Sequence, residues 1–253
     1  MVFYRLSPFA VALVSVIGFY LSINDIVAPV VVMTVAVFLC AFIIARLLQW
    51  QWRTFQFWHL LGTPILFLFS SFSSFLLLET QLFRLLLAIF TIAIFWLFVE
   101  QIFVFIHFPV RYKPFTLEHL SQAIHVLSIF FFSTFGFGLL LFLHVKLWLL
   151  CLIFFPILFF IMHSTLWASK IDGRRAREYA LSGAILMTEL FAAISFLPTG
   201  FYTNAAFLAL GVYILLGLSR ADAMRKLSKE VVLRYVLLFV ALVSVVAATS
   251  QWM

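Results

Sequence analysis

The sequence predicts an all-α fold: one polytopic membrane domain, residues 1–253, with about nine transmembrane helices. Hydrophobic side chains make up 66% of the 253 residues and charged side chains only 10%, whereas soluble domains carry about a quarter charged residues. The apolar residues form long uninterrupted runs without the period-2 alternation of membrane strands. Because backbone groups in hydrocarbon must hydrogen-bond internally, such runs are expected to be helices.

Nine apolar runs alternate with short polar or basic connections. We expect helices over residues 7–22, 28–45, 57–78, 84–108, 120–143, 147–167, 180–197, 203–218 and 231–249. Most of these runs approach the roughly 20 residues that cross hydrocarbon as a helix, although the first and eighth are shorter. The first run, preceded by Arg5, also has the character of an uncleaved signal anchor.

The basic residues predict the orientation of these spans. With the N-terminus in the cytoplasm, fourteen of the 16 Lys and Arg residues lie in cytoplasmic segments, and only Arg84 and Lys146 lie outside. The fourteen are Arg5, Arg46, Arg53, Arg111, Lys113, Lys170, Arg174, Arg175, Arg177, Arg220, Arg225, Lys226, Lys229 and Arg234. This asymmetry is the positive-inside pattern, so the C-terminus is expected outside. The net charge of +7 therefore belongs to short loops, and we expect no nucleic-acid partner.

The connections add boundary signals in chain order. Trp50 and Trp52, before the third run, are typical of side chains at the headgroup level. Pro114 followed by Thr116 predicts a loop and an N-cap for the fifth helix. Asp172-Gly173 predicts a turn before the seventh run.

The packing of the spans is expected to differ along the chain. Twenty-four of the 34 phenylalanines lie between residues 55 and 160, so spans three to six should pack loosely or present rings to lipid. Spans seven to nine are richer in Gly, Ala and Ser, which allow close helix approach. Those three helices could also dock a protein partner or a second copy of the chain.

Two carboxylates inside apolar runs are the most informative polar residues. Glu100 lies eight residues from the cytoplasmic end of the fourth run, and Glu189 lies nine residues into the seventh. At about 1.5 Å per residue, both are about 12–14 Å deep from the same side. Intramembrane charges are costly and commonly functional. We therefore expect a proton-, ion- or substrate-binding site formed by Glu100 and Glu189, with Gln101 and Thr188 as hydrogen-bonding neighbours.

Four histidines occur near the cytoplasmic ends of spans and could support that site: His59, His107, His125 and His163. Glu100 and His107 are seven residues apart, about 10.5 Å along one helix, which is too far for both to bind one ion. We expect interfacial histidines that bond to headgroups or loop carbonyls, and we expect no metal and no cofactor.

Helix breakers suggest a second set of candidate features. Gly62-Thr63-Pro64, the SSFSS segment at 70–74, TFGFG at 134–138 and Pro156 could mark broken helices that line a polar path, as in transporters. Catalytic motifs are absent, since the chain has no Gly-rich phosphate loop, GxSxG or CxxC. No resemblance to a known family is identified, and no catalytic residue is assigned.

These observations favour a small transporter-like or proton- and ion-handling protein, expected in a bacterial inner (plasma) membrane. Two alternatives remain open. The chain could be a non-catalytic membrane subunit or scaffold that docks through the small-residue faces of spans seven to nine. It could also be an intramembrane enzyme that acts on lipid from the cytoplasmic side, although a non-enzymatic role is favoured.

Overall fold

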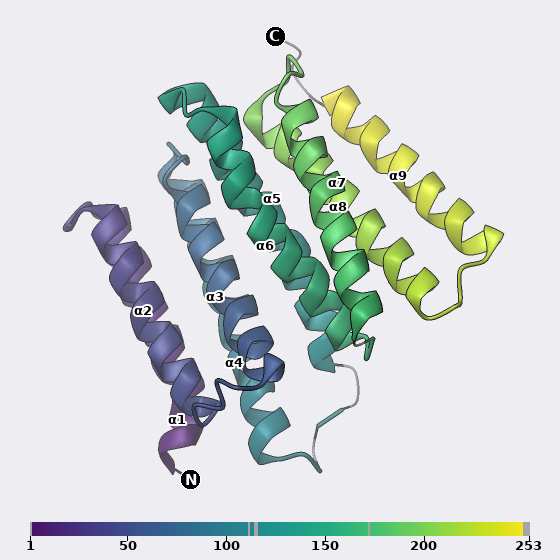
Figure 1. Ribbon diagram of the computed structural model, residues 1–253. Coiled ribbons are helices and arrows are strands. Elements are labelled where there is room, and N and C mark those ends of the chain that lie inside the picture. Colours follow the sequence, from purple (N-terminus) through teal and green to yellow (C-terminus); the bar gives the residue numbers. More distant parts are fainter. Residues whose placement is uncertain (1, 111, 114–115, 172, 250–253) are drawn as a thin grey trace. The chain divides into compact units, whose positions relative to one another are not determined.

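The computed structural model describes residues 2–110, 112–113, 116–171 and 173–249. This part of the chain contains nine α-helices and no β-strand (Figure 1). The helices are α1 (Val2–Ile23), α2 (Pro29–Leu47), α3 (Phe55–Phe75), α4 (Gln81–His107), α5 (Thr116–Leu143), α6 (Leu147–Ala168), α7 (Arg174–Ile194), α8 (Phe201–Ala223) and α9 (Lys229–Thr249). Each predicted run coincides with one helix, which confirms the all-α fold.

Seven of the described helices are long and apolar enough to cross a membrane: α1 to α6 and α8. The chain is therefore a helical, membrane-embedded protein. The predicted number of spans was nine, and α7 and α9 are the two helices that do not meet this criterion. Both extend beyond their apolar runs into charged segments, because α7 begins with Arg174 and Arg175 and α9 begins with Lys229 and Glu230.

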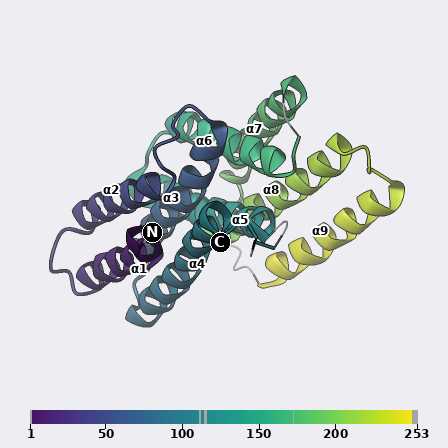
Figure 2. The ribbon, with the colours of Figure 1, turned by 90° about the horizontal axis from the view of Figure 1, so that it is seen from below.

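The first of two compact units comprises Met1–Ile124. In it α1 contacts α2 and α4, and α3 contacts the same two helices, so that the four helices form a closed ring of neighbours (Figure 2). Phe19 of α1 stacks on Phe72 of α3 with ring centroids 4.0 Å apart. Gly18 allows this approach, since a Cβ there would lie 3.1 Å from the Phe72 ring. Aromatic stacking and a small residue thus hold the centre of this unit.

The second unit comprises His125–Met253, that is, most of α5 together with α6 to α9. Its core contains a column of three rings: Phe132 lies 4.7 Å from Phe154, and Phe154 stacks on Phe191 at 4.0 Å. Gly136 of α5 faces this column, because a Cβ there would lie 2.8 Å from the Phe154 ring. α9 packs along α8 and leaves most of its own surface exposed (Figure 1).

Two packing expectations are met only in part. The phenylalanine-rich helices expose some rings, such as Phe83 and Phe142. They are not loose, because Phe67, Phe72, Phe95, Phe98 and Phe154 are completely or almost completely buried. Aromatic rings bury large, rigid areas and stack favourably, so they build the interior rather than only face lipid. Close packing does not extend uniformly over α7 to α9 either, since α9 carries a broad exposed apolar face.

The expected helix breaks do not occur. α3 continues through Pro64, α6 continues through Pro156, and α5 continues through residues 134–138. Proline is tolerated inside membrane helices where neighbouring groups satisfy the freed backbone carbonyl. The buried polar residues of these helices therefore lie on continuous helix faces.

α5 begins at Thr116, the residue predicted as its N-cap. The Thr116 hydroxyl does not cap the helix, because it donates to the Lys113 carbonyl oxygen at 3.0 Å. The Leu117 N–H donates to the Tyr112 hydroxyl at 3.0 Å instead. Arg111, Pro114 and Asp172 lie outside the described residues.

Candidate functional site

One face of α3 carries polar side chains through most of the helix. His59, Thr63, Ser70 and Ser74 are all buried, and their spacings of four, seven and four residues place them on the same side of the helix. His59 and Ser74 are fifteen residue steps apart, or about 22 Å at 1.5 Å per residue. Phe67, which is also fully buried, interrupts this face in the middle. We call the four polar residues, His59, Thr63, Ser70 and Ser74, the α3 polar face.

The hydrogen bonds of this region show how the polar groups are satisfied. His59 Nε2 lies 3.5 Å from the hydroxyl of Ser121, on the part of α5 that belongs to the same unit. Ser70 donates to the Phe67 carbonyl at 3.0 Å, and Ser73 donates to the Phe69 carbonyl at 2.8 Å. Hydroxyls bonded to their own helix keep oxygen lone pairs that can still accept hydrogen bonds.

A cavity of about 230 Å³ opens beside the predicted cytoplasmic end of this helix. Its lining residues come from α3, α4 and the connection between α2 and α3: Leu48, Gln49, Gln51, Thr54, Gln56, Phe57, Leu60, Phe105 and Ile106. Three glutamine amides and a threonine hydroxyl give it both donors and acceptors. Leu60 lines the cavity and follows His59 directly, so polar, water-compatible space reaches the first turns of α3.

Glu100 lies at the edge of the first unit. It is half-buried on α4, next to the completely buried Val99. Gln101 beside it is half-buried as well. Among the described residues, no hydrogen bond or ion pair engages the Glu100 carboxylate. Its carboxylate is thus accessible at the surface of the unit rather than enclosed at its centre.

Glu189 lies on an exposed face of α7 in the second unit. Its neighbour Thr188 is half-buried, and the Thr188 hydroxyl donates to the Ala184 carbonyl of the same helix at 2.7 Å. That donor is therefore used by the backbone. The expected Glu100–Glu189 pair would draw on both units, and it stays a prediction.

The four histidines separate into two kinds. His59 and His125 are buried at 1% and 0% exposure, which corrects the expectation that they are interfacial. They lie on helix faces that turn toward neighbouring helices. His107 and His163 are half-buried. His107 makes ring contacts with Tyr4 and Phe103, each at 5.0 Å, and its nitrogens have no hydrogen-bond partner among the described residues.

In the second unit, His125 is linked to a hydroxyl. Its Nδ1 atom lies 3.0 Å from Oγ1 of Thr165 on α6. That hydroxyl lies 2.9 Å from the Ile161 carbonyl oxygen one turn earlier. No group of three or more potential metal ligands occurs within the described ranges.

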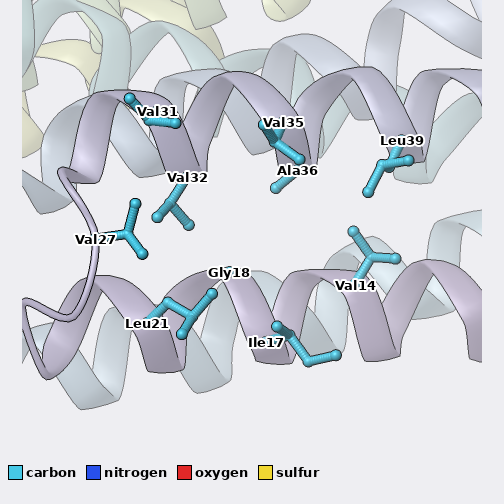
Figure 3. Close-up of a pocket in the computed structure, with 10 residues that line it drawn as sticks. All are labelled: Val14, Ile17, Gly18, Leu21, Val27, Val31, Val32, Val35, Ala36 and Leu39. Carbon is cyan, nitrogen blue, oxygen red and sulfur yellow. The ribbon is translucent and has the colours of Figure 1, made fainter.

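A further cavity lies between α1 and α2 and is drawn in Figure 3. It measures about 240 Å³, and all ten lining residues are apolar; Val14, Ile17 and Leu21 contribute from α1, and Val32, Ala36 and Leu39 from α2. A site that binds ions or other polar ligands needs convergent polar groups. This cavity offers none and is therefore no part of the polar site.

The members of the α3 polar face recur at helical spacing in the sequence. Their burial, which separates them from other hydroxyl-bearing residues, is visible only in the structure. Comparisons with protein-family models, with curated proteins and with solved structures find no match for this chain. The fold defines the class, a polytopic helical membrane protein, and the interior polar residues are its candidate functional groups.

Proposed function

We propose that this protein is a small transporter-like protein that moves protons or small cations across a membrane, in a bacterial inner membrane. The observation that carries the proposal is the α3 polar face, with His59 at its cytoplasmic end. Polar side chains buried inside a membrane protein are costly and tend to mark ion and proton pathways. Here they extend for about 22 Å along one helix, most of the roughly 30 Å hydrocarbon thickness.

The cytoplasmic end and the middle of the α3 polar face have features that such a pathway needs. The glutamine-lined cavity of about 230 Å³ provides hydrated space beside the cytoplasmic turns of α3. His59 is a titratable group at that end and is held near the Ser121 hydroxyl. Phe67 separates Thr63 from Ser70 with a buried apolar ring, so the proposed path requires this ring to move. An apolar constriction of this kind gates by excluding water.

In the proposed transporter, Glu100 and Glu189 are the acidic groups that bind the transported ion. An ionised carboxylate in hydrocarbon costs at least about 2.5–3.5 kcal/mol. Glu100 and Glu189 lie at the surfaces of their units, where each carboxylate offers oxygen ligands to a cation that crosses the membrane. Gln101 can accept or donate a hydrogen bond beside Glu100.

The test is flux into proteoliposomes under an imposed pH or cation gradient. We expect His59→Gln and Glu100→Gln to lower the rate at least tenfold, and Glu189→Gln to lower it as well. His144→Gln is the matched control, because His144 is exposed in the connection between α5 and α6. Wild-type flux equal to that of empty liposomes would sink the proposal, as would full activity of the His59 and Glu100 variants.

A second candidate function is a membrane subunit that docks a second copy of the chain or another protein through α9. The supporting observation is the exposed apolar face of α9, which includes Leu233, Leu237 and Val240. The test is disulfide cross-linking in native membranes of Leu237→Cys, with the buried Leu208→Cys of α8 as control. Cross-links that require Leu237→Cys favour docking, and equal yields for the two variants contradict it.

A further inference from the structure

A groove of about 450 Å³ opens at the connection between α8 and α9. Its lining residues are Leu227 and Ser228 of the connection and Lys229, Val232, Leu233 and Val236 of α9. Ligand sites commonly have volumes of about 300–1,000 Å³. This groove, which we call the α9 groove, combines an apolar wall with a cationic side chain. It therefore suits a ligand that has both an apolar and an anionic part.

The α9 groove changes from charged to apolar along the axis of α9. Val232, Leu233 and Val236 follow Lys229 by three, four and seven residues, so the four side chains share one helix face. Val236 lies about 10.5 Å further along the axis than Lys229, at 1.5 Å per residue. Lys229 is at the end that the basic residues predict to be cytoplasmic. The apolar wall continues from it toward the membrane interior, which is the polarity of a phospholipid with its phosphate at the surface.

The packing of α9 on α8 leaves this face open. Tyr235 of α9 lies against Gly217 of α8, where a Cβ would lie 2.4 Å from the ring. Leu233 and Val236 lie on another side of α9 and are 58% and 46% exposed. Leu227 in the connection is 45% exposed as well. Apolar side chains gain free energy by leaving water, so these three favour contact with a hydrocarbon chain.

Three basic residues lie at the charged end of the α9 groove or directly before it in the chain: Arg225, Lys226 and Lys229. All three are exposed. Within the described ranges, none of their side chains forms an ion pair or a hydrogen bond. Together with Glu230 they leave a net charge of +2 on residues 225–230. These cations are therefore available to an anionic ligand.

We propose that the α9 groove binds an anionic phospholipid of the cytoplasmic leaflet. Its phosphate lies among the three basic side chains, and one acyl chain lies along the apolar wall formed by Val232, Leu233 and Val236. Each basic residue near an anionic lipid contributes about fivefold in affinity. The apolar wall gives the lipid a defined place, which electrostatic attraction to a charged surface does not. The inference is independent of the proposed transport.

The basic residues at the start of α7 offer a comparison within the same unit. Arg174, Arg175 and Arg177 are also exposed, and they lie at the same end, because Tyr179 of α7 donates a hydrogen bond to Asp222 near the end of α8. Arg174 forms an ion pair on its own helix at 2.7 Å, and Arg175 lies over the Tyr179 ring. The positive-inside pattern accounts for both clusters. The lipid site is expected only where the apolar groove adjoins the charge.

The test is native mass spectrometry of the full-length protein in a non-ionic detergent, titrated with phosphatidylglycerol or with phosphatidylcholine of the same acyl chains. We expect the first phosphatidylglycerol to bind at least about fivefold more tightly than the first phosphatidylcholine. Equal affinity for the two lipids overturns the inference. This comparison uses the wild type alone, so it does not depend on the folding of any variant.

Charge variants locate the headgroup. Arg225→Gln, Lys226→Gln and Lys229→Gln combined should weaken phosphatidylglycerol binding at least about fivefold, whereas Arg225→Lys combined with Lys229→Arg keeps the charge and should keep the affinity. The matched control combines Arg174→Gln, Arg175→Gln and Arg177→Gln, which removes the same charge from α7 and should change the affinity less than about twofold. Equal losses from the two clusters mean general electrostatic attraction and overturn the site.

A pair of leucine variants locates the acyl chain. Leu233→Asn should weaken phosphatidylglycerol binding at least about threefold, since apolar contact with the chain is lost. Leu237→Asn is the control, because Leu237 is 60% exposed on the same helix but is not among the residues that line the groove. Equal affinities of these two variants would show that no acyl chain lies in the groove, and they overturn the inference.

The same spectra test a second copy of the chain as the occupant of the groove, because they report the number of chains in each complex. A wild-type dimer that Leu233→Asn dissociates, with unchanged affinity for phosphatidylglycerol, would assign the groove to a second copy and overturn the lipid site. A complex whose number of chains is the same in the wild type and in Leu233→Asn, with weakened lipid binding in the variant, supports it. Neither result depends on whether the protein transports ions.

Discussion

Replacing Phe154 by alanine tests whether phenylalanine rings build the interior of the second unit. The ring is completely buried and contacts Phe132 at 4.7 Å and Phe191 at 4.0 Å. In soluble cores Phe→Ala costs about 3–5 kcal/mol, part of which is transfer from water. Lipid replaces water as the reference for a membrane helix, so that part is reduced. Two aromatic contacts of about 0.5–1.5 kcal/mol each remain.

We therefore expect Phe154→Ala to lower the free energy of unfolding by about 1–3 kcal/mol, the sum of those two contacts. The measurement is reversible unfolding in mixed micelles. Leu152→Ala on the same helix is the control, because Leu152 is 67% exposed and should cost under about 0.5 kcal/mol, as surface substitutions usually do. Equal losses in the two variants, or no loss in Phe154→Ala, would refute the reasoning and return the rings to the role of lipid-facing filler.

Three further predictions follow from individual contacts. Gly136→Ala should lower the free energy of unfolding by about 1–3 kcal/mol by overpacking, since its Cβ would meet the stacked Phe154 ring at 2.8 Å. Gly200→Ala, with open space around it, should be nearly neutral in the same unfolding assay. Equal effects would contradict the packing. The hydrogen bond to Asp222 and, to a smaller extent, burial raise the pKa of Tyr179 above its usual value of 10.0. The stability lost in Tyr179→Phe should therefore be constant below pH 10 and should vanish as the pH rises through the raised pKa. A pH-independent difference in melting temperature between the wild type and the variant would argue against this bond. Orientation can be tested with single cysteines in a chain whose own two cysteines are replaced. Ser228→Cys should react with an impermeant maleimide from the cytoplasmic side, and His144→Cys should react from the outside. The reverse pattern would invert the orientation derived from the basic residues.

The fold was predictable because bilayer chemistry leaves few options. Every apolar run coincides with a helix, and Thr116 begins α5 as its position after the loop predicted. The number of membrane-spanning helices was less predictable. α7 and α9 combine apolar runs with charged first turns, so their length and composition do not decide whether they cross the membrane. The proline positions were misleading, since continuous helices tolerate Pro64 and Pro156.

The candidate site was only partly predictable. Charge draws attention to Glu100 and Glu189, and a sequence shows their depth along a helix but not the direction in which each side chain points. The structure leaves Glu189 on an exposed face and encloses His59 and His125. Burial depends on which neighbouring helix covers a face, and that covering comes from residues distant in the chain, such as Thr165 opposite His125.

The sequence by itself determined that this is a helical membrane protein, where its helices lie, and the orientation that its basic loops favour. These properties follow from the cost of apolar, polar and charged groups in hydrocarbon, which is a local quantity. Only the tertiary structure decided that a polar face of α3 is enclosed and that the Thr165 hydroxyl lies 3.0 Å from the buried ring of His125. Both depend on contacts between helices, and such contacts are set by packing across the bundle rather than by any single segment.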